Sequence, residues 1–388
     1  MKYKLILLIP IILFMTGCWN YRELNQLAIT TALAIDGGSN GTGYRVSLLI
    51  ANGKNNQTNN REGQSQTVVY TGEGETISRA FKEINLQIPK NPYIGHLGVV
   101  VIGEDVAKEG MKGVLDYLLR DPESVKRFYL IMAHDDKAED VIKVLSPLET
   151  FPGQSITTNI SIAHEQEAIS TKITYSKYVE SLLKKGKDPS LPSISISGNN
   201  KKASNDKSLE SSNVEAHTTL GPIALFKNDK LVHLTEKEES TGINIITNQI
   251  DEMIVDTKCD NGNIVVNLKN MNSKTKVNFK NNKPIVSISV DAEGEIQEIS
   301  CNKNIQENKV ILEIEKEMEK EIKVKLKKAT DITQKFETDI FGIGNLFYKK
   351  YPNYFEKIKD WHNEYKNVTF TYNVDIHLTT KGSVEKTL

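Results

Sequence analysis

Histidine offers the widest catalytic and metal-binding chemistry of any residue type in this chain, which contains seven of them. They are His96, His134, His164, His217, His233, His362 and His377. No two have the spacing of zinc ligands, and the stretch HEQE at His164 lacks the second histidine of a zinc-protease motif. The stretch TGEGET at Thr71 lacks the third glycine of a dinucleotide loop and the lysine of a P-loop. Since a G-x-S-x-G elbow is also missing, we expect neither an enzyme nor a cofactor.

One short stretch, His134-Asp135-Asp136, groups an imidazole with two carboxylates, which are the side chains that bind metal ions. The alternative is a solvated loop between a strand and a helix, in which Asp135 or Asp136 caps the helix. We favour the loop, and so expect no metal site.

Thiol chemistry centres on Cys18. An apolar run from Leu5 to Phe14 precedes it, with two lysines before the run and small residues after it. A bilayer span needs roughly 20 apolar residues, so this run is too short to be one. Residues 1–17 instead resemble a bacterial lipoprotein signal, after which the Cys18 sulfur receives a diacylglycerol. The alternative is an ordinary signal peptide that leaves Cys18 free. On the first reading Trp19 lies at the membrane surface, where aromatic rings are favoured.

Only two other cysteines occur, Cys259 and Cys301. Export permits a disulfide between them, and the alternative is two separately buried thiols. The formal net charge of −1 gives no footprint for nucleic acid. No segment after Cys18 is long and apolar enough to span a bilayer.

The elements that must position these residues fall into two halves. Strands and helices alternate through residues 18–198, which predicts an N-terminal α/β-type domain, with a second module that could start near residue 150. A polar stretch at 199–213 reads as a linker. Residues 214–388 are expected to form a C-terminal α+β domain.

The C-terminal half shows the clearest periodicity. Three strands with alternating apolar residues are expected at 264–268, 275–279 and 286–290. A long amphipathic helix should follow from Ile311 to Phe336, and then a half-exposed strand at 368–378. The whole chain is therefore expected to be a multi-domain α+β protein, with mixed or antiparallel sheets flanked by helices.

Four stretches resemble the Ger(x)C family of spore germination lipoproteins, which supply the C subunit of germinant receptors. The matching residues in the first two stretches are Gly17, Cys18, Trp19, Arg22, Glu23 and Asp36, then His96, Gly110, Leu115, Asp116, Arg120 and Asp121. Those in the last two are Gly221, Phe226, Lys227, Asp229 and Leu231, then Asp339, Gly342, Gly344, Tyr351, Pro352 and Trp361. The third stretch departs from the family at His233, where the family usually has a glycine and an aromatic residue after Leu-Val.

The resemblance implies a non-enzymatic lipoprotein on the outer face of the spore inner membrane. It would work beside two integral membrane partners, the A and B subunits, and members look like three α+β modules. A rival reading from another class is a solute-binding lipoprotein of a transport system, which would need two similar lobes around a cleft.

Two groups of matching residues suggest contacts. Arg22 and Glu23 either meet a partner or form a solvated ion pair. Asp339, Gly342 and Gly344 interrupt a helical stretch, and Asp339 is expected to be an exposed helix cap. We hypothesise that this segment sets the angle between the long helix and the final strand, and so shapes a partner-binding surface. The alternative is a corner needed only for folding.

Overall fold

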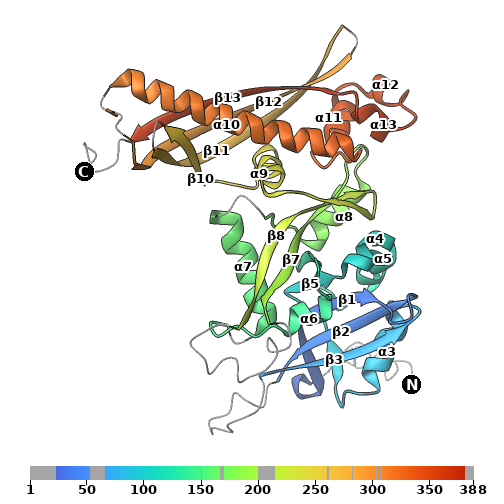
Figure 1. The fold of residues 1–388 in the computed structure, drawn as a ribbon. Coiled ribbons are helices and arrows are strands. Elements are labelled where there is room, and N and C mark those ends of the chain that lie inside the picture. Colours follow the sequence, from blue (N-terminus) through green and yellow to red (C-terminus); the bar gives the residue numbers. More distant parts are fainter. Residues whose placement is uncertain are drawn as a thin grey trace, which may run out of the picture.

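The computed structural model describes residues 23–52, 66–149, 151–166, 170–199, 215–259, 262–281, 283–301, 304–305 and 307–380. Two β-sheets organise the chain, one in each half, and they lie at opposite ends of an elongated molecule (Figure 1). The fold class is therefore α+β with more than one domain, as the sequence predicts.

The first sheet has nine strands in the order β3-β2-β1-β5-β6-β7-β8-β9, with β4 paired to β1. They are β1 (Leu27–Gly37), β2 (Tyr44–Ala51), β3 (Thr67–Gly74), β4 (Asn91–Tyr93), β5 (Val99–Ile102), β6 (Tyr129–Ala133), β7 (Ser190–Gly198), β8 (Ala216–Lys227) and β9 (Lys230–Leu234). The central strands β1, β5, β6 and β7 run parallel. Parallel strands are covered on both faces, which explains why β5 is an unbroken apolar run.

Helices cover both faces of this sheet. They are α3 (Ile77–Asn85), α4 (Glu104–Glu109), α5 (Lys112–Arg120), α6 (Ala138–Lys143), α7 (Pro152–Gln166) and α8 (Tyr175–Leu183). Residues of α3, α4, α5 and α8 pack with Leu33 and Ile35 of β1 on one face. Residues of α6 and α7 pack with Ala32 and Ala34 on the other. Successive strand residues point to opposite faces, so one strand serves two cores.

The pairing of β7 with β8 spans the expected domain boundary, which stays a prediction. These strands are antiparallel neighbours, with Gly198 opposite Ala216. The expected linker at 199–213 therefore joins two strands of one sheet, and its residues from 200 on lie outside the described residues. By sheet membership the chain leaves the N-terminal half only after β9. The polar composition of residues 199–213 predicted a connection at this place. It did not indicate that the strands on either side, β7 and β8, pair with each other.

The second sheet has the strand order β10-β11-β12-β13. Its strands are β10 (Met253–Cys259), β11 (Gly262–Lys280), β12 (Lys283–Ile299) and β13 (Thr369–Thr380). The strands expected at 264–268 and 275–279 are one strand, because β11 continues through an irregularity between Lys269 and Asn272. Asn270 adopts a positive φ of 53° there, and asparagine tolerates that backbone conformation.

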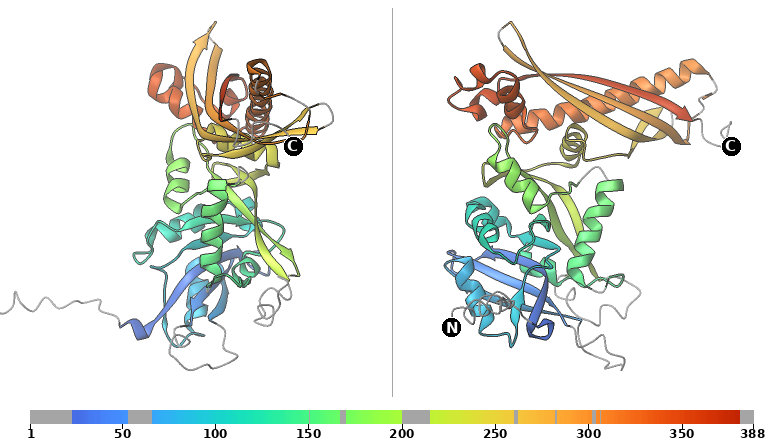
Figure 2. Two further views of the ribbon diagram at one scale, coloured as in Figure 1. Left: turned by 90° about the vertical axis from the view of Figure 1, so that its left-hand side faces the viewer. Right: turned by 180° about the vertical axis from the view of Figure 1, so that it is seen from behind.

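Helices α9 (Lys237–Ile246) and α10 (Asn308–Lys335) pack against this sheet. The long helix α10 runs along the length of the sheet (Figure 2). Six of the buried residues of α10 recur at three- and four-residue steps: Ile314, Met318, Ile322, Leu326, Ala329 and Thr333. The long amphipathic helix is thus confirmed. Three short helices, α11 (Ile343–Lys350), α12 (Pro352–Phe355) and α13 (Trp361–Tyr365), complete the C-terminal half. In the part of the chain that the structure describes, no helix is both long and apolar enough to cross a membrane.

Candidate functional site

The expected site residues lie in three places. Cys18, Trp19 and Arg22 precede the first described residue. Glu23 is exposed, and its carboxylate accepts a hydrogen bond from the Asn25 side-chain amide at 3.0 Å. Asp339, Gly342 and Gly344 lie just before α11 and in its first turn, where they are buried, and Cys259 and Cys301 lie in the core of the C-terminal half.

Asp339 is fully buried, so the expectation of an exposed cap was wrong. One of its carboxylate oxygens accepts the Ile343 backbone N–H at 2.9 Å, and the other accepts the Gly344 N–H at 2.7 Å. The Trp361 indole N–H also donates to the second oxygen, at 2.9 Å. One carboxylate therefore fixes the first turn of α11 and the start of α13 together.

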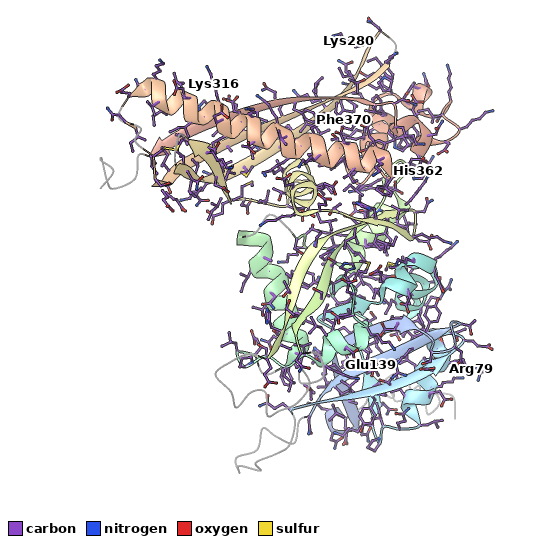
Figure 3. The ribbon with its side chains drawn as sticks, in the orientation of Figure 1. Arg79, Glu139, Lys280, Lys316, His362 and Phe370 are labelled. Atoms are coloured by element: carbon purple, nitrogen blue, oxygen red, sulfur yellow. A yellow bond between two sulfur atoms is a disulfide. The ribbon has the colours of Figure 1, made fainter. Side chains whose placement is uncertain are left out.

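Asp188, from the N-terminal half, is the partner of Asp339. The Asp188 N–H donates to the Asp339 carbonyl oxygen at 2.8 Å, and the Asp339 N–H donates to the Asp188 carboxylate at 2.8 Å. The other carboxylate oxygen of Asp188 accepts the Asn228 N–H at 2.9 Å. His362 Nε2 lies 3.1 Å from both oxygens, at the edge of the C-terminal half in Figure 3. We call Asp188, Asn228, Asp339, Trp361 and His362 the junction.

A second set of contacts surrounds the junction. The Lys227 ammonium donates to the Glu337 carboxylate at 2.8 Å, and Lys366 forms an ion pair with the same carboxylate. These two partners lower the pKa of Glu337 to about 2. The buried Thr338 hydroxyl donates to the Phe226 carbonyl oxygen. The turn between β8 and β9 is therefore held against the end of α10.

Three of the four motif stretches meet through these contacts. Asp229 follows Asn228, and its carboxylate accepts the Lys112 N–H at 3.1 Å while its carbonyl accepts the Met111 N–H at 2.9 Å. The turn at Asn228-Asp229 thus holds the start of α5 on one side and the junction on the other. Stretches more than 100 residues apart in the chain form one continuous structure here.

The family model described as "Spore germination protein N-terminal domain" matches residues 20–196, and "Spore germination B3/ GerAC like, C-terminal" matches residues 222–382. The chain belongs to the Ger(x)C family of spore germination proteins.

Relatives in the Ger(x)C family align along nearly the whole chain. Spore germination protein KC of Bacillus subtilis (strain 168) is 28% identical over 93% of this chain and 90% of its own length. Spore germination protein GerQC of Bacillus cereus is 24% identical over 98% of this chain and 99% of its own. The crystal structure of the GerBC protein superposes with a TM-score of 0.53 at 19% identity, covering 90% of this chain and 97% of that one. The last likeness shows the shared fold.

The stretch His134-Asp135-Asp136 lies in the loop between β6 and α6, and His134 pairs with a neighbouring carboxylate. Glu104, His134 and Asp135 bring their ligand atoms close together. His134 Nδ1 lies 2.8 Å from the Glu104 carboxylate, which also pairs with Lys108 at 2.6 Å. Neither Asp135 nor Asp136 caps α6. Its first N–H groups, those of Ala138 and Glu139, donate instead to Asp36 at the end of β1, at 2.8 and 2.9 Å.

Asp188 and His362 were missed by reasoning from the sequence. Asp188 stands in the polar stretch KKGKDP after α8, where neither periodicity nor a motif marks it. Its importance comes from a partner 151 residues away in the chain. Asp339 and Trp361 could be found, because they belong to a stretch that resembles the family.

Gly344 lies beside the junction, against Trp361 and Gly186. An added methyl carbon there would lie 2.5 Å from Trp361 Nε1 and 2.7 Å from the Gly186 Cα. Gly186 has a φ of +67°, and its carbonyl accepts the Asn345 N–H at 3.1 Å. The two halves therefore approach through two residues that have no side chain.

We expect Gly344→Ala to lower the free energy of unfolding by about 3 kcal/mol, the upper end of the usual cost of overpacking, because the added carbon forces the backbones apart. Gly342→Ala is the matched control. Its added carbon would meet only the flexible Lys187 stem, at 3.2 Å, although the φ of +72° adds about 1 kcal/mol of strain. Urea denaturation of both variants measures the difference. Equal stability of the two variants would contradict the close approach.

Burial and hydrogen bonding shift the proton equilibria of the junction. Burial raises the pKa of Asp339 to about 7, against the opposing effect of its three hydrogen bonds. The hydrogen bond to Asp188 raises the pKa of His362 above its ordinary value. Both groups hold a proton more tightly in the folded protein than in the unfolded chain. Their contribution to stability is therefore complete at low pH and is lost as the pH rises through the folded-state pKa values.

We expect the urea midpoint of the wild-type protein to fall as the pH rises from about 4 to about 7, between the ordinary and the folded-state pKa of Asp339, and to fall further above pH 6.5 as His362 loses its proton. His362→Gln removes one titrating group while keeping a side chain that can donate to Asp188. Its midpoint should therefore fall less over the same range. Parallel curves for the two proteins would contradict the proposed protonation of His362.

Proposed function

We propose that this chain is the lipid-anchored C subunit of a nutrient germinant receptor, acting beside integral membrane A and B subunits at the outer face of the spore inner membrane. The observation that carries the proposal is the order of the two family matches. They begin at residue 20, two residues after Cys18, and run to residue 382. The proteins similar over this length are named as spore germination proteins.

The anchor proposed for this subunit is a diacylglyceryl group on Cys18, with residues 1–17 removed as the signal. Two acyl chains hold a protein stably at a membrane, whereas one chain holds it only marginally. The short apolar run and the small residues before Cys18 support this reading.

We propose that the subunit works through contacts rather than catalysis. The most deeply buried acidic groups of the junction support a structural role. Asp339 accepts three hydrogen bonds from its own chain, and Asp188 accepts bonds from Asn228 and Asp339 and contacts His362. Carboxylates committed in this way can hold the halves of the subunit in one orientation toward its partners.

A solute-binding lipoprotein is not favoured. That class places a ligand between two similar lobes. The two sheets here differ in strand number, strand order and covering helices, since nine strands form the first and four form the second.

The proposal is tested in sporulating cells with Cys18→Ala and with a deletion of the gene. The alanine variant should incorporate no labelled fatty acid and should leave the membrane fraction. Both strains should make spores that respond poorly to nutrients but germinate normally with agents that bypass nutrient receptors. Labelled fatty acid on the variant would refute the anchor. A normal nutrient response of the deletion strain to every nutrient mixture tested would refute the receptor role.

A further inference from the structure

Two exposed leucines lie where the described chain begins. Leu24 is 71% exposed in η1 (Leu24–Gln26), and Leu86 is 83% exposed at the end of α3. The segments that carry them are neighbours, because Leu27 of β1 pairs with Asn91 of β4. Together they line a surface depression of about 720 Å³, whose residues are Asn25, Gln26, Asn85, Ile88, Pro89, Lys90 and Asn91. We call Leu24, Asn25, Leu86, Ile88 and Lys90 the end face.

The end face lies at one extremity of the molecule. In Figures 1 and 2 the start of β1 and the connection from α3 to β4 are at the end opposite to α10 and the second sheet. Exposed leucines also occur elsewhere. Leu148 lies before α7, and Leu312 lies in α10 with 55% of its surface exposed. What sets Leu24 and Leu86 apart is their position next to the N-terminal chain.

The length of that chain limits how far the end face can be from a lipid attached to Cys18. Glu23 follows Cys18 by five residues. Five extended residues span at most about 17 Å. Since Glu23 precedes Leu24 directly, the end face cannot leave the neighbourhood of the anchor.

We propose that the end face rests on the lipid surface, with Leu24 and Leu86 in the interfacial region and the Lys90 ammonium near lipid phosphates. This inference rests on the proposed lipid anchor at Cys18. Leucine side chains enter the boundary between headgroups and acyl chains favourably, and lysine keeps its charge among the headgroups. The anchored subunit then stands upright, with its N-terminal half at the membrane and its second sheet projecting away from it. The N-terminal half is accordingly the part that meets membrane-embedded partners.

The test uses the full lipidated protein in phospholipid vesicles. Leu86→Cys introduces a single reactive thiol, because Cys18 carries lipid and Cys259 and Cys301 form a disulfide. Leu312→Cys is the matched control, since it replaces an exposed leucine in α10, at the end of the molecule opposite to the end face (Figure 1). Each thiol receives an environment-sensitive fluorophore, and its emission is measured with and without brominated lipids.

At position 86 we expect a blue shift and a loss of emission with brominated lipids. The control position, 312, should show neither. Vesicle flotation, scored on the same samples, reports the anchor independently. Vesicle flotation together with a fluorophore at position 86 that brominated lipids do not quench would overturn the upright orientation but not the anchor. A blue shift without quenching would count the same way, because contact between protein copies can also shield the fluorophore from water. Failure to float would overturn the anchor, and the inference with it.

Discussion

Replacing Asp339 by alanine is expected to lower the free energy of unfolding by about 3–5 kcal/mol. The side chain is fully buried and accepts hydrogen bonds from Ile343, Gly344 and Trp361. Each buried donor left without an acceptor costs about 1–3 kcal/mol. Relief of the desolvation of the Asp339 carboxylate offsets part of the sum. The variant subunit should therefore be scarce in spores, and the nutrient response should fail because the protein is missing.

The matched control is Asp331→Ala. Asp331 lies on the exposed face of α10 and pairs with Lys327, so its loss should cost at most about 1 kcal/mol. Urea denaturation of the purified proteins and immunoblots of spores measure the two effects. An Asp339→Ala protein that is stable and abundant, in spores that respond poorly to nutrients, would instead favour our hypothesis that this segment shapes a partner surface.

Elements governed by local periodicity could be predicted from the sequence. The buried stripe of α10 from Ile314 to Ala329 and the alternation of β12 and β13 depend only on neighbouring residues. The parallel strands of the first half could also be recognised, because Val99–Ile102 is apolar throughout and lies between helices. The fold class follows from these elements alone.

Features governed by distant partners could not be predicted. Asp339 has the sequence context of a surface cap, and only Asp188 and Trp361 reveal that it is buried. The polar stretch after β7 resembles a linker between domains, but β8 returns to pair with β7. In both cases a short segment carries the same local signal whether or not another part of the chain covers it.

The function of this Ger(x)C protein, like its buried junction, does not follow from local sequence patterns. The contacts of the junction are made within the chain. The contacts between the two halves indicate a rigid connection. The halves are joined through Asp188 and Asp339, and the glycine contact between Gly186 and Gly344 leaves little room for relative movement. If the subunit is anchored as we propose, this connection would transmit the position of the N-terminal half to the second sheet.

Breaking the disulfide between Cys259 and Cys301 is expected to lower the free energy of unfolding by about 4 kcal/mol on the chain-entropy model. Of the two alternatives for these cysteines, the structure contains the bridge, with Cα atoms 6.2 Å apart and 42 residues of sequence separation. It connects the end of β10 to the chain after β12, across β11, which lies between them. Both cysteines are buried in the C-terminal core, so the bridge closes one end of the second sheet.

Mass spectrometry of the protein alkylated without reductant should find both cysteines unmodified, and urea denaturation should show a lower midpoint after reduction. The double variant Cys259→Ala/Cys301→Ala is the control, because alanine removes the sulfur atoms without placing a polar group in the core. Its midpoint should match that of the reduced wild-type protein and should not change with reductant. Two alkylated thiols in the unreduced wild-type protein would instead establish separately buried cysteines, and reduction would then leave the stability of the second sheet unchanged.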